Sequence, residues 1–292
     1  MQLKLNKTEL AGALAALGKL ISRTAPVEAS RAVEITGFAD TLYFRTRNAF
    51  EEIEFTMFAE MDEDFPATLV NFEQFRLAVR NCKNKTLKLE VDSGKVVIED
   101  ARMAPVNGHF PLKEKIQEQN ACMTELPADT LSALSMLAPL TDRTNSRKVL
   151  GGINISGDGF TAANDKELLN IPLSLEMTGS VTIPFPLTLI ATKAFGESGK
   201  LTTWQKDEDT HFELTLGNWT WRAKAFKENY LLDFINIDNL GELDKDLDER
   251  VIENEIVKNI RDFIIRFGTD FIFMGNQYRI EISEEEMFID LL

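Results

Sequence analysis

The sequence of 292 residues predicts an α+β fold in which short amphipathic helices alternate with sets of antiparallel strands. A strand–helix–strands pattern recurs four times along the chain and once more in part. The strands show apolar residues at every second position, and 44% of all residues are hydrophobic, which is enough for a substantial core. At about 150 residues per domain, this length favours two domains.

The first predicted domain spans residues 1–115 and holds two of these units. Its first helix is expected over residues 8–21 with Thr8 as N-cap, and its second over residues 72–82 with Asn71 as N-cap. Strands are expected at residues 2–6, 32–36, 41–45, 51–58, 67–70, 86–91, 95–99 and 102–106.

The second predicted domain spans residues 121–237 and follows a polar connector at residues 113–120. Its helices are expected over residues 128–140 and 186–195. Its strands are expected at residues 152–156, 159–163, 172–177, 180–183, 200–205, 211–216 and 218–226. Residues 238–292 are then an acidic linker and a partial third domain, with a helix at 252–267 and strands at 271–274, 277–282 and 286–291.

Residues suited to catalysis are scarce and scattered. The two histidines, His109 and His211, lie in different parts of the chain, and His211 sits in an alternating stretch typical of a strand surface. Cys82 and Cys122 form neither a disulfide framework nor a zinc site, and neither has a local partner that would make its thiol reactive. The sequence therefore predicts a non-enzymatic protein with no cofactor and no metal.

Two segments imitate ligand loops but lack required residues. Residues 196–200 end like a phosphate-binding loop, yet Ala194 occupies the position of its first glycine and Leu201 the position of its hydroxyl residue. Residues 244–255 imitate a calcium loop, but Glu249 stands where the sharp turn needs glycine. A turn and a solvated acidic linker are the better interpretations.

Localisation signals are also lacking in the sequence. No apolar run approaches the roughly 18 residues of a membrane span, and residues 1–10 alternate like a strand and unlike a signal peptide. We therefore expect a soluble, cytoplasmic protein that makes no membrane contact.

The positive charge is concentrated around the predicted helices. The chain has 47 acidic and 32 basic residues, a net charge of −15, which argues against nucleic-acid binding through bulk charge. Four segments around the first four helices nevertheless hold 12 basic and 5 acidic residues: 8–24, 71–88, 127–148 and 184–200. Helix dipoles favour cations at helix C-termini by about 0.3–1 kcal/mol each, which explains Arg23 or Lys83 without a ligand. They do not explain the scarcity of acidic residues in these segments.

A shared basic face on the helices would attract phosphates by charge alone, independently of sequence and sensitive to salt. The candidate DNA-binding residues are Lys19, Arg23, Arg76, Arg80, Lys83, Arg143, Arg147, Lys148, Lys193 and Lys200.

Several motifs, taken in order, resemble those of the bacterial sliding clamp, the DNA polymerase III beta subunit family. Residues 149–155 and 160–169 are similar to a Gly-Ile strand, a hairpin and an Ala-Thr-Asp-Gly-His-Arg-Leu sequence of the clamp. Residues 180–184 resemble the segment that leads into its next helix, and Phe110-Pro111 resembles the Phe-Pro that ends a clamp domain. The resemblance covers essentially the whole chain at low identity.

The resemblance implies a closed ring around duplex DNA, with helices lining the hole and sheets forming the outer wall. Such a ring tethers a replicative DNA polymerase as a processivity factor, and a clamp loader and other partners dock through short peptide motifs in an apolar cleft. In the cleft motif Asp165 and Leu169 match the clamp pattern, whereas residues 166–168 depart from it and change the chemistry of the cleft. The cleft residues implied are Asp165, Leu168, Leu169, Phe288, Ile289 and Leu291, and the last three equally suit an ordinary buried strand.

The length raises the question of how such a ring would close. A typical bacterial clamp has three domains and dimerises, whereas this chain has two full domains and part of a third. Two-domain clamps close as trimers, so we favour a homotrimer, with a dimer as the alternative. A divergent phage or mobile-element clamp would fit this reduced form. The competing hypothesis is a clamp-fold adaptor or inhibitor that binds replication or transcription proteins without encircling DNA.

Overall fold

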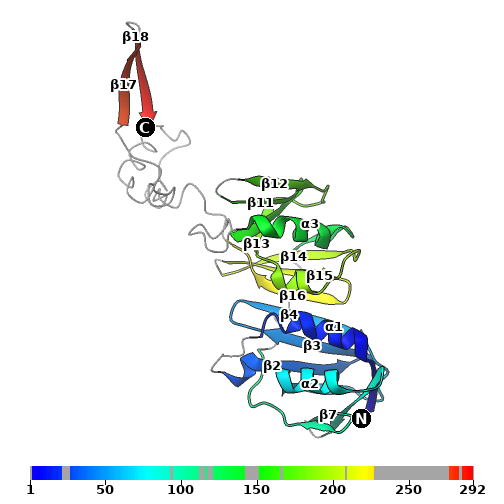
Figure 1. The fold of residues 1–292 in the computed structure, drawn as a ribbon. Helices are drawn as coiled ribbons and strands as arrows, with labels where there is room; N and C mark the ends of the chain where they lie inside the picture. The colour runs from blue at the N-terminus through cyan, green and yellow to red at the C-terminus, as the bar shows by residue number, and fades with distance from the viewer. Residues whose placement is uncertain are drawn as a thin grey trace. The chain divides into compact units, whose positions relative to one another are not determined.

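The computed structural model of the chain describes residues 2–21, 27–92, 95–111, 116, 121–141, 151–164, 167–207, 209–226, 276–282 and 285–291, the last two ranges as backbone. The density of contacts divides the chain into two units, Met1–Lys227 and Glu228–Leu292. In the second unit the described residues form an antiparallel hairpin of β17 (Asn276–Ile282) and β18 (Glu285–Leu291) (Figure 1). The fold described below is that of the first unit.

The described residues of the first half of this unit form two α-helices and eight strands. They follow the order β1 (Gln2–Asn6), α1 (Lys7–Leu17), β2 (Ala32–Phe38), β3 (Thr41–Arg47), β4 (Glu51–Phe58), β5 (Phe65–Asn71), α2 (Phe72–Asn81), β6 (Thr86–Asp92), β7 (Lys95–Ile98) and β8 (Ala101–Met103).

The second half repeats this order element by element. It runs β9 (Ala121–Leu126), α3 (Thr130–Leu137), β10 (Gly152–Ser156), β11 (Gly159–Ala163), β12 (Leu168–Pro172), β13 (Ser180–Pro184), α4 (Leu187–Ala191), β14 (Gly199–Lys206), β15 (Asp209–Leu216) and β16 (Trp219–Lys224). Thus β12 corresponds to β4, and β16 corresponds to β8.

The two halves share one large antiparallel sheet. Its strand order is β5-β2-β3-β4-β16-β15-β14-β9, so the halves meet where β4 pairs with β16. Each half adds a four-stranded sheet of its own, with the orders β1-β6-β7-β8 and β12-β11-β10-β13. The predicted boundary between domains at 1–115 and 121–237 falls inside this unit, and that division stays a prediction.

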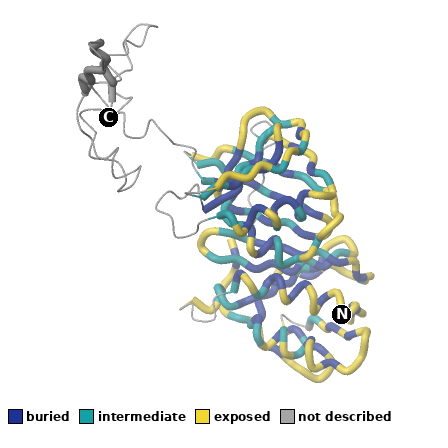
Figure 2. The backbone as a smooth tube through the Cα atoms, turned by 45° about the horizontal axis from the view of Figure 1, so that its top comes forward, coloured by how far each residue is buried: buried dark blue, intermediate teal, exposed yellow. Residues whose placement is uncertain are grey.

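The four helices lie in one row along the unit. Helix α1 contacts α2 on one side and α4 on the other, and α4 contacts α3, which gives the order α2-α1-α4-α3 (Figure 1). Buried residues run through both halves, and exposed residues lie on the loops, on one side of the helices and along the edge strand β12 (Figure 2).

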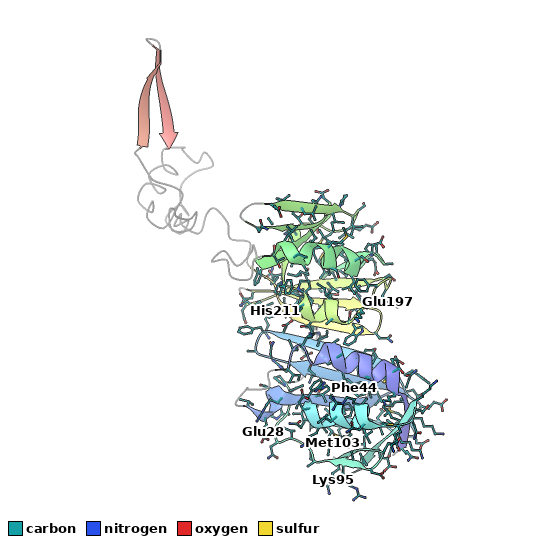
Figure 3. The ribbon with its side chains drawn as sticks, in the orientation of Figure 1. Glu28, Phe44, Lys95, Met103, Glu197 and His211 are labelled. Carbon is teal, nitrogen blue, oxygen red and sulfur yellow. The ribbon has the colours of Figure 1, made fainter. Side chains whose placement is uncertain are left out.

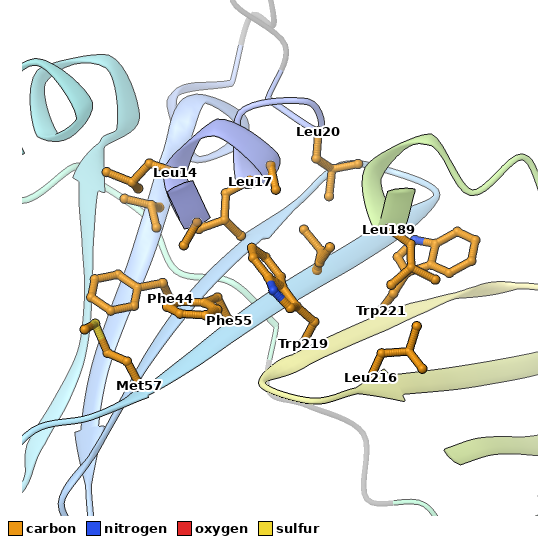
Figure 4. Close-up of a cluster of buried hydrophobic side chains, with 14 of the residues drawn as sticks. Leu14, Leu17, Leu20, Phe44, Phe55, Met57, Leu189, Leu216, Trp219 and Trp221 are labelled. Carbon is orange, nitrogen blue, oxygen red and sulfur yellow. The ribbon is translucent and has the colours of Figure 1, made fainter. Parts of the chain in front are cut away.

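A continuous apolar core fixes the helices on the sheets. At the junction of the halves Phe55 packs on Trp219, with ring centroids 4.8 Å apart, and Trp221 is fully buried beside them. Leu17 of α1 and Leu189 of α4 are also fully buried, and they lie above these rings (Figure 4). Burial of apolar surface stabilises the folded state by about 25 cal/mol per Å². Residues of both halves bury such surface together, so one core stabilises the junction and each half.

The predicted α+β class is confirmed, but several element bounds differ from expectation. Helix α1 begins one residue before Thr8, because the side-chain oxygen of Asn6 accepts hydrogen bonds from the amides of Thr8 (2.9 Å) and Glu9 (3.2 Å) and so acts as the N-cap. Helix α4 has five residues and not the ten predicted, and Lys193 beyond it adopts a left-handed φ of 58°. The strand expected at residues 172–177 lies earlier, as β12, and ends at Pro172, which has no amide hydrogen to donate.

Opposite the helices, the sheet carries a buried charged cluster. Arg45 pairs with Glu34 at 2.7 Å and with Glu52 at 3.4 Å, and it donates a hydrogen bond to the carbonyl of Pro111 at 3.3 Å. The ring of Phe110 covers the guanidinium, 5.4 Å from its centroid. The segment before the predicted connector therefore crosses the outer face of the sheet and buries this cluster.

Candidate nucleic-acid interface

The cations of the first half are presented by α2 and by the turns that follow both helices. Phe72, Phe75 and Val79 of α2 face the core, and this places Arg76 half-exposed and Arg80 exposed on the other side. Asn71 caps the helix as predicted, accepting a hydrogen bond from the amide of Gln74 at 3.1 Å. Lys19 and Lys83, beyond the two helices, are exposed.

The positive charge of α2 is partly neutralised within the helix. Arg76 pairs with Glu73 at 2.6 Å, and both side chains are little more than one third exposed. An exposed pair of this kind contributes about 0–1 kcal/mol to stability, so Arg76 can exchange its partner for a phosphate. Among the described residues, Arg80 and Lys83 make no side-chain ion pair, so they are the stronger candidates for DNA contact.

Lys7 is a cation that the sequence analysis did not single out. Its ammonium donates hydrogen bonds to the carbonyl of Arg80 (3.2 Å) and to the carbonyl of Cys82. These carbonyls end α2, where the helix dipole favours positive charge. Lys7 therefore serves the structure of the helix end, and only tertiary pairing of β1 with β6 brings it there.

The second half presents fewer described cations. Lys193 is exposed beyond α4. Lys200 lies in β14 next to Leu201, which is buried in the core that the helices share, so alternation directs Lys200 to the opposite face of the sheet. The structure therefore does not bring Lys200 together with the helix-side cations. Arg23, Arg143, Arg147 and Lys148 lie outside the described residues.

The described helix row thus carries more positive than negative charge. Its candidate cations are Lys19, Arg76, Arg80, Lys83 and Lys193, and the acidic residues of the same helices and adjoining turns are Glu9, Glu73, Asp129 and Glu197. The described part of α3 carries no charged side chain. The helix row can therefore attract phosphate by charge, and the described residues offer no arrangement for reading base edges.

The predicted peptide cleft is described only in part. Leu168 and Leu169 lie in β12, the edge strand of its sheet, and are 71% and 40% exposed. Asp165 lies outside the described residues. Phe288, Ile289 and Leu291 lie in β18 of the second unit, and their side chains are outside the description. An edge strand with exposed leucines is a surface that a partner chain can cover.

The described residues contain no group of three or more His, Cys, Asp or Glu side chains placed to hold a metal ion. None of the described helices is long and apolar enough to cross a bilayer. His211, labelled in Figure 3, stacks on Trp204 with ring centroids 5.7 Å apart, so its position is a surface packing site.

Comparison with solved structures identifies the architecture. The DNA polymerase sliding clamp from Bacillus subtilis matches with a TM-score of 0.64 at 13% identity, over 100% of this chain and 84% of that chain. The Helicobacter pylori beta clamp bound to a DNA ligase peptide matches with a TM-score of 0.63 at 16% identity, over 84% of this chain and 70% of that chain. The Pseudomonas aeruginosa sliding clamp gives a TM-score of 0.61 at 15% identity, over 84% and 68%. The expected clamp fold is confirmed.

Comparison of sequences gives a different match at the C-terminus. Residues 223–292 match the family model of the YhcG PDDEXK nuclease domain. These are largely the residues expected to form a linker and a partial third clamp domain, and that expectation stays a prediction. A search of curated proteins gave no significant match.

Proposed function

We propose that the chain is a sliding clamp that encircles duplex DNA and tethers a replicative DNA polymerase as a non-catalytic processivity factor in the cytoplasm. The observation that carries the proposal is the row of helices with exposed cations, in a clamp fold whose acidic residues otherwise outnumber its basic ones. A ring linked to DNA by topology needs no tight contact, so a few phosphate-facing cations suffice. An acidic exterior would repel stray DNA.

The internal repeat supports closure of a ring. Within the chain β4 of the first half pairs with β16 of the second. The corresponding strands β12 and β8 are both edge strands of their sheets. If β12 of one copy pairs with β8 of the next, the junction inside the chain is repeated between copies, head to tail. A homotrimer is the favoured closed ring, and a homodimer is the alternative.

Partner proteins, among them a clamp loader and a polymerase, would dock through short peptide motifs, as the resemblance to the sliding clamp implies. The exposed Leu168 and Leu169 are the described part of the proposed cleft. Asp165, Phe288, Ile289 and Leu291 complete the proposed set. The Helicobacter pylori structure with a DNA ligase peptide supports this mode of binding for a protein of the same fold.

The DNA contact is tested by reversing two helix-side charges. We expect Arg80→Glu with Lys83→Glu to shorten retention on nicked circular DNA by about tenfold at moderate salt, because binding weakens steeply as phosphate contacts are lost. Retention is measured by gel filtration of labelled protein with the DNA circle, before and after the circle is linearised. Lys4→Glu with Lys95→Glu reverses the same charge on exposed strand positions outside the helix row and should leave retention unchanged.

Other outcomes separate the two clamp-fold hypotheses. Loss of the wild-type protein from the DNA on linearisation, with one fixed oligomer mass by light scattering, supports the ring. A monomer that is not retained on circles would instead support the adaptor or inhibitor. Equal retention of the double variant and the wild type would overturn the assignment of the DNA-facing surface.

A second candidate function rests on the family-model match of residues 223–292 alone. In this case the C-terminal segment is part of a nuclease, and the clamp-fold unit delivers it to DNA. The match predicts cleavage of plasmid DNA by the purified full chain with Mg²⁺, abolished by EDTA. Intact plasmid after prolonged incubation at high protein concentration would reject nuclease activity of this chain and leave the clamp proposal standing.

A further inference from the structure

A cavity of about 1090 Å³ opens where the two halves meet, at one end of the β4–β16 junction. Its walls come from the β3–β4 turn, from the ends of β14, β15 and β16, and from Pro111 and Phe185. The lining residues that matter here are Arg47, Phe50, Glu52, Trp204, His211 and Arg222. The volume slightly exceeds the roughly 300–1,000 Å³ of small-molecule sites, which suits several residues of a peptide.

Two hydrogen-bond donors of this cavity lack acceptors among the described residues. The indole nitrogen of Trp204 is buried and has no hydrogen-bond partner there. Arg47 lies directly opposite Glu52 across the β3–β4 pair, but Glu52 contacts Arg45 instead. Within the described part of the chain, Arg47 makes no ion pair. Arg47 is only partly buried, so its guanidinium can donate charge-assisted hydrogen bonds to a ligand that brings a carboxylate.

Apolar contact is available beside these donors. Phe50, at the tip of the β3–β4 turn, is 85% exposed, although the amide oxygen of Asn48 fixes the turn by accepting hydrogen bonds from the amides of Phe50 (2.7 Å) and Glu51 (2.9 Å). On the opposite wall, Trp204 and His211 are stacked. An exposed aromatic ring held by a rigid turn is typical of a position that packs against a partner side chain.

The charges of the cavity indicate an acidic ligand. Four cations line it, Arg47, Lys206, Arg222 and Lys224, against the carboxylates Glu51, Glu52 and Asp209. Arg222 pairs with Glu213 and Lys224 with Asp209, so Arg47 is the cation that a ligand's carboxylate would meet. The carboxylates are engaged within the wall: Glu51 accepts from the indole of Trp221 at 2.7 Å, Glu52 contacts Arg45, and Asp209 pairs with Lys224. These three fixed carboxylates repel a negatively charged ligand. A nucleic acid carries a charge on every phosphate and is repelled more strongly than a peptide with a single acidic side chain.

We propose that this cavity docks a short extended peptide of a partner protein, in which an acidic residue stands next to an aromatic or aliphatic one. The carboxylate binds Arg47, the apolar side chain packs on Phe50, and the stacked rings of Trp204 and His211 form part of the wall. The site shares no residue with the proposed cleft at β12 and does not depend on the encircling of DNA.

The probe for this site is a random dodecapeptide phage library panned on the full-length protein, with counter-selection on the Arg47→Glu variant. The strongest peptide is then made with a fluorescein label and titrated by fluorescence anisotropy. We expect enriched sequences to carry Asp or Glu beside Phe, Trp or Leu. Affinity should fall by about tenfold or more in Arg47→Glu, because a charge-assisted hydrogen bond is replaced by repulsion, and severalfold in Phe50→Ala, because the apolar contact is lost.

Lys95→Glu, an exposed reversal in β7, is the matched control and should bind the peptide as the wild type does. Failure to enrich any motif, or equal binding by Arg47→Glu and the wild type, would overturn the proposal. So would displacement of the peptide by a short oligothymidylate, which would assign the cavity to single-stranded nucleic acid. Retention on circular DNA is measured in parallel: Arg47→Glu should keep it, so failure here and failure of the ring proposal are distinguished.

Discussion

Replacing Arg45 by methionine is expected to lower the free energy of unfolding by about 3–5 kcal/mol at neutral pH. Arg45 is 4% exposed and is the cation of a buried cluster with Glu34, which is 7% exposed, and Glu52. Methionine fills much of the same volume but leaves these carboxylates without their positive partner. Urea unfolding followed by circular dichroism measures the change. Lys95→Met, at an exposed position in β7, is the matched control and should change stability by less than about 0.5 kcal/mol.

The loss of stability in Arg45→Met should depend on pH. Burial raises the pKa of Glu34, and the charge and hydrogen bond of Arg45 lower it only in part. A carboxyl whose pKa is raised by folding contributes its stability below the unfolded pKa and loses it as pH rises through the folded pKa. Without Arg45 the pKa of Glu34 rises further, so ionisation of Glu34 becomes more costly in the folded state.

The destabilisation by Arg45→Met should therefore be larger at about pH 7.5 than at about pH 4.5, where Glu34 can accept a proton. The same urea experiment at both pH values checks this. A loss of equal size at both would show that packing, and not the uncompensated carboxylates, accounts for the effect.

The local patterns of the sequence predict the repeat well. The apolar spacing of Phe72, Phe75 and Val79 places α2 within one residue of its end, and Asn71 caps it as expected. At α1 the expected cap was Thr8, but Asn6, two residues earlier, caps the helix because its amide oxygen accepts from two amides at once. Such a choice depends on the path of the preceding strand, which local sequence does not specify.

Features that depend on contacts between distant parts of the chain were not predicted from the sequence. Lys200 was grouped with the helices because it is near α4 in sequence, although its alternation with the buried Leu201 could have placed it on the other face. Nothing local shows that β4 pairs with β16 across more than 150 residues, or that Phe110 covers Arg45. The cavity at the junction follows from that pairing, so no motif indicated it.

A proline at position 170 is expected to abolish the proposed ring while leaving the protomer folded. In the β11–β12 pair, hydrogen bonds join Asn164 to Glu167 and Leu173 to Asp158 at the two ends. Because bonded and non-bonded pairs alternate in antiparallel sheets, Asn170, opposite Thr161, is a non-bonded position whose amide points to the open edge. Asn170→Pro therefore removes a donor that only a neighbouring copy could use.

Asn170→Ala is the matched control, because it removes the side-chain hydrogen bond to Thr161 (2.8 Å) but keeps the outward amide. Light scattering should give a monomer for Asn170→Pro and the wild-type oligomer for Asn170→Ala, with melting temperatures within a few degrees of each other. Retention on circular DNA should vanish only in the proline variant. An unchanged oligomer mass in Asn170→Pro would exclude β12 as the closing edge, and a ring would then have to close through another edge, such as β9 of the large sheet.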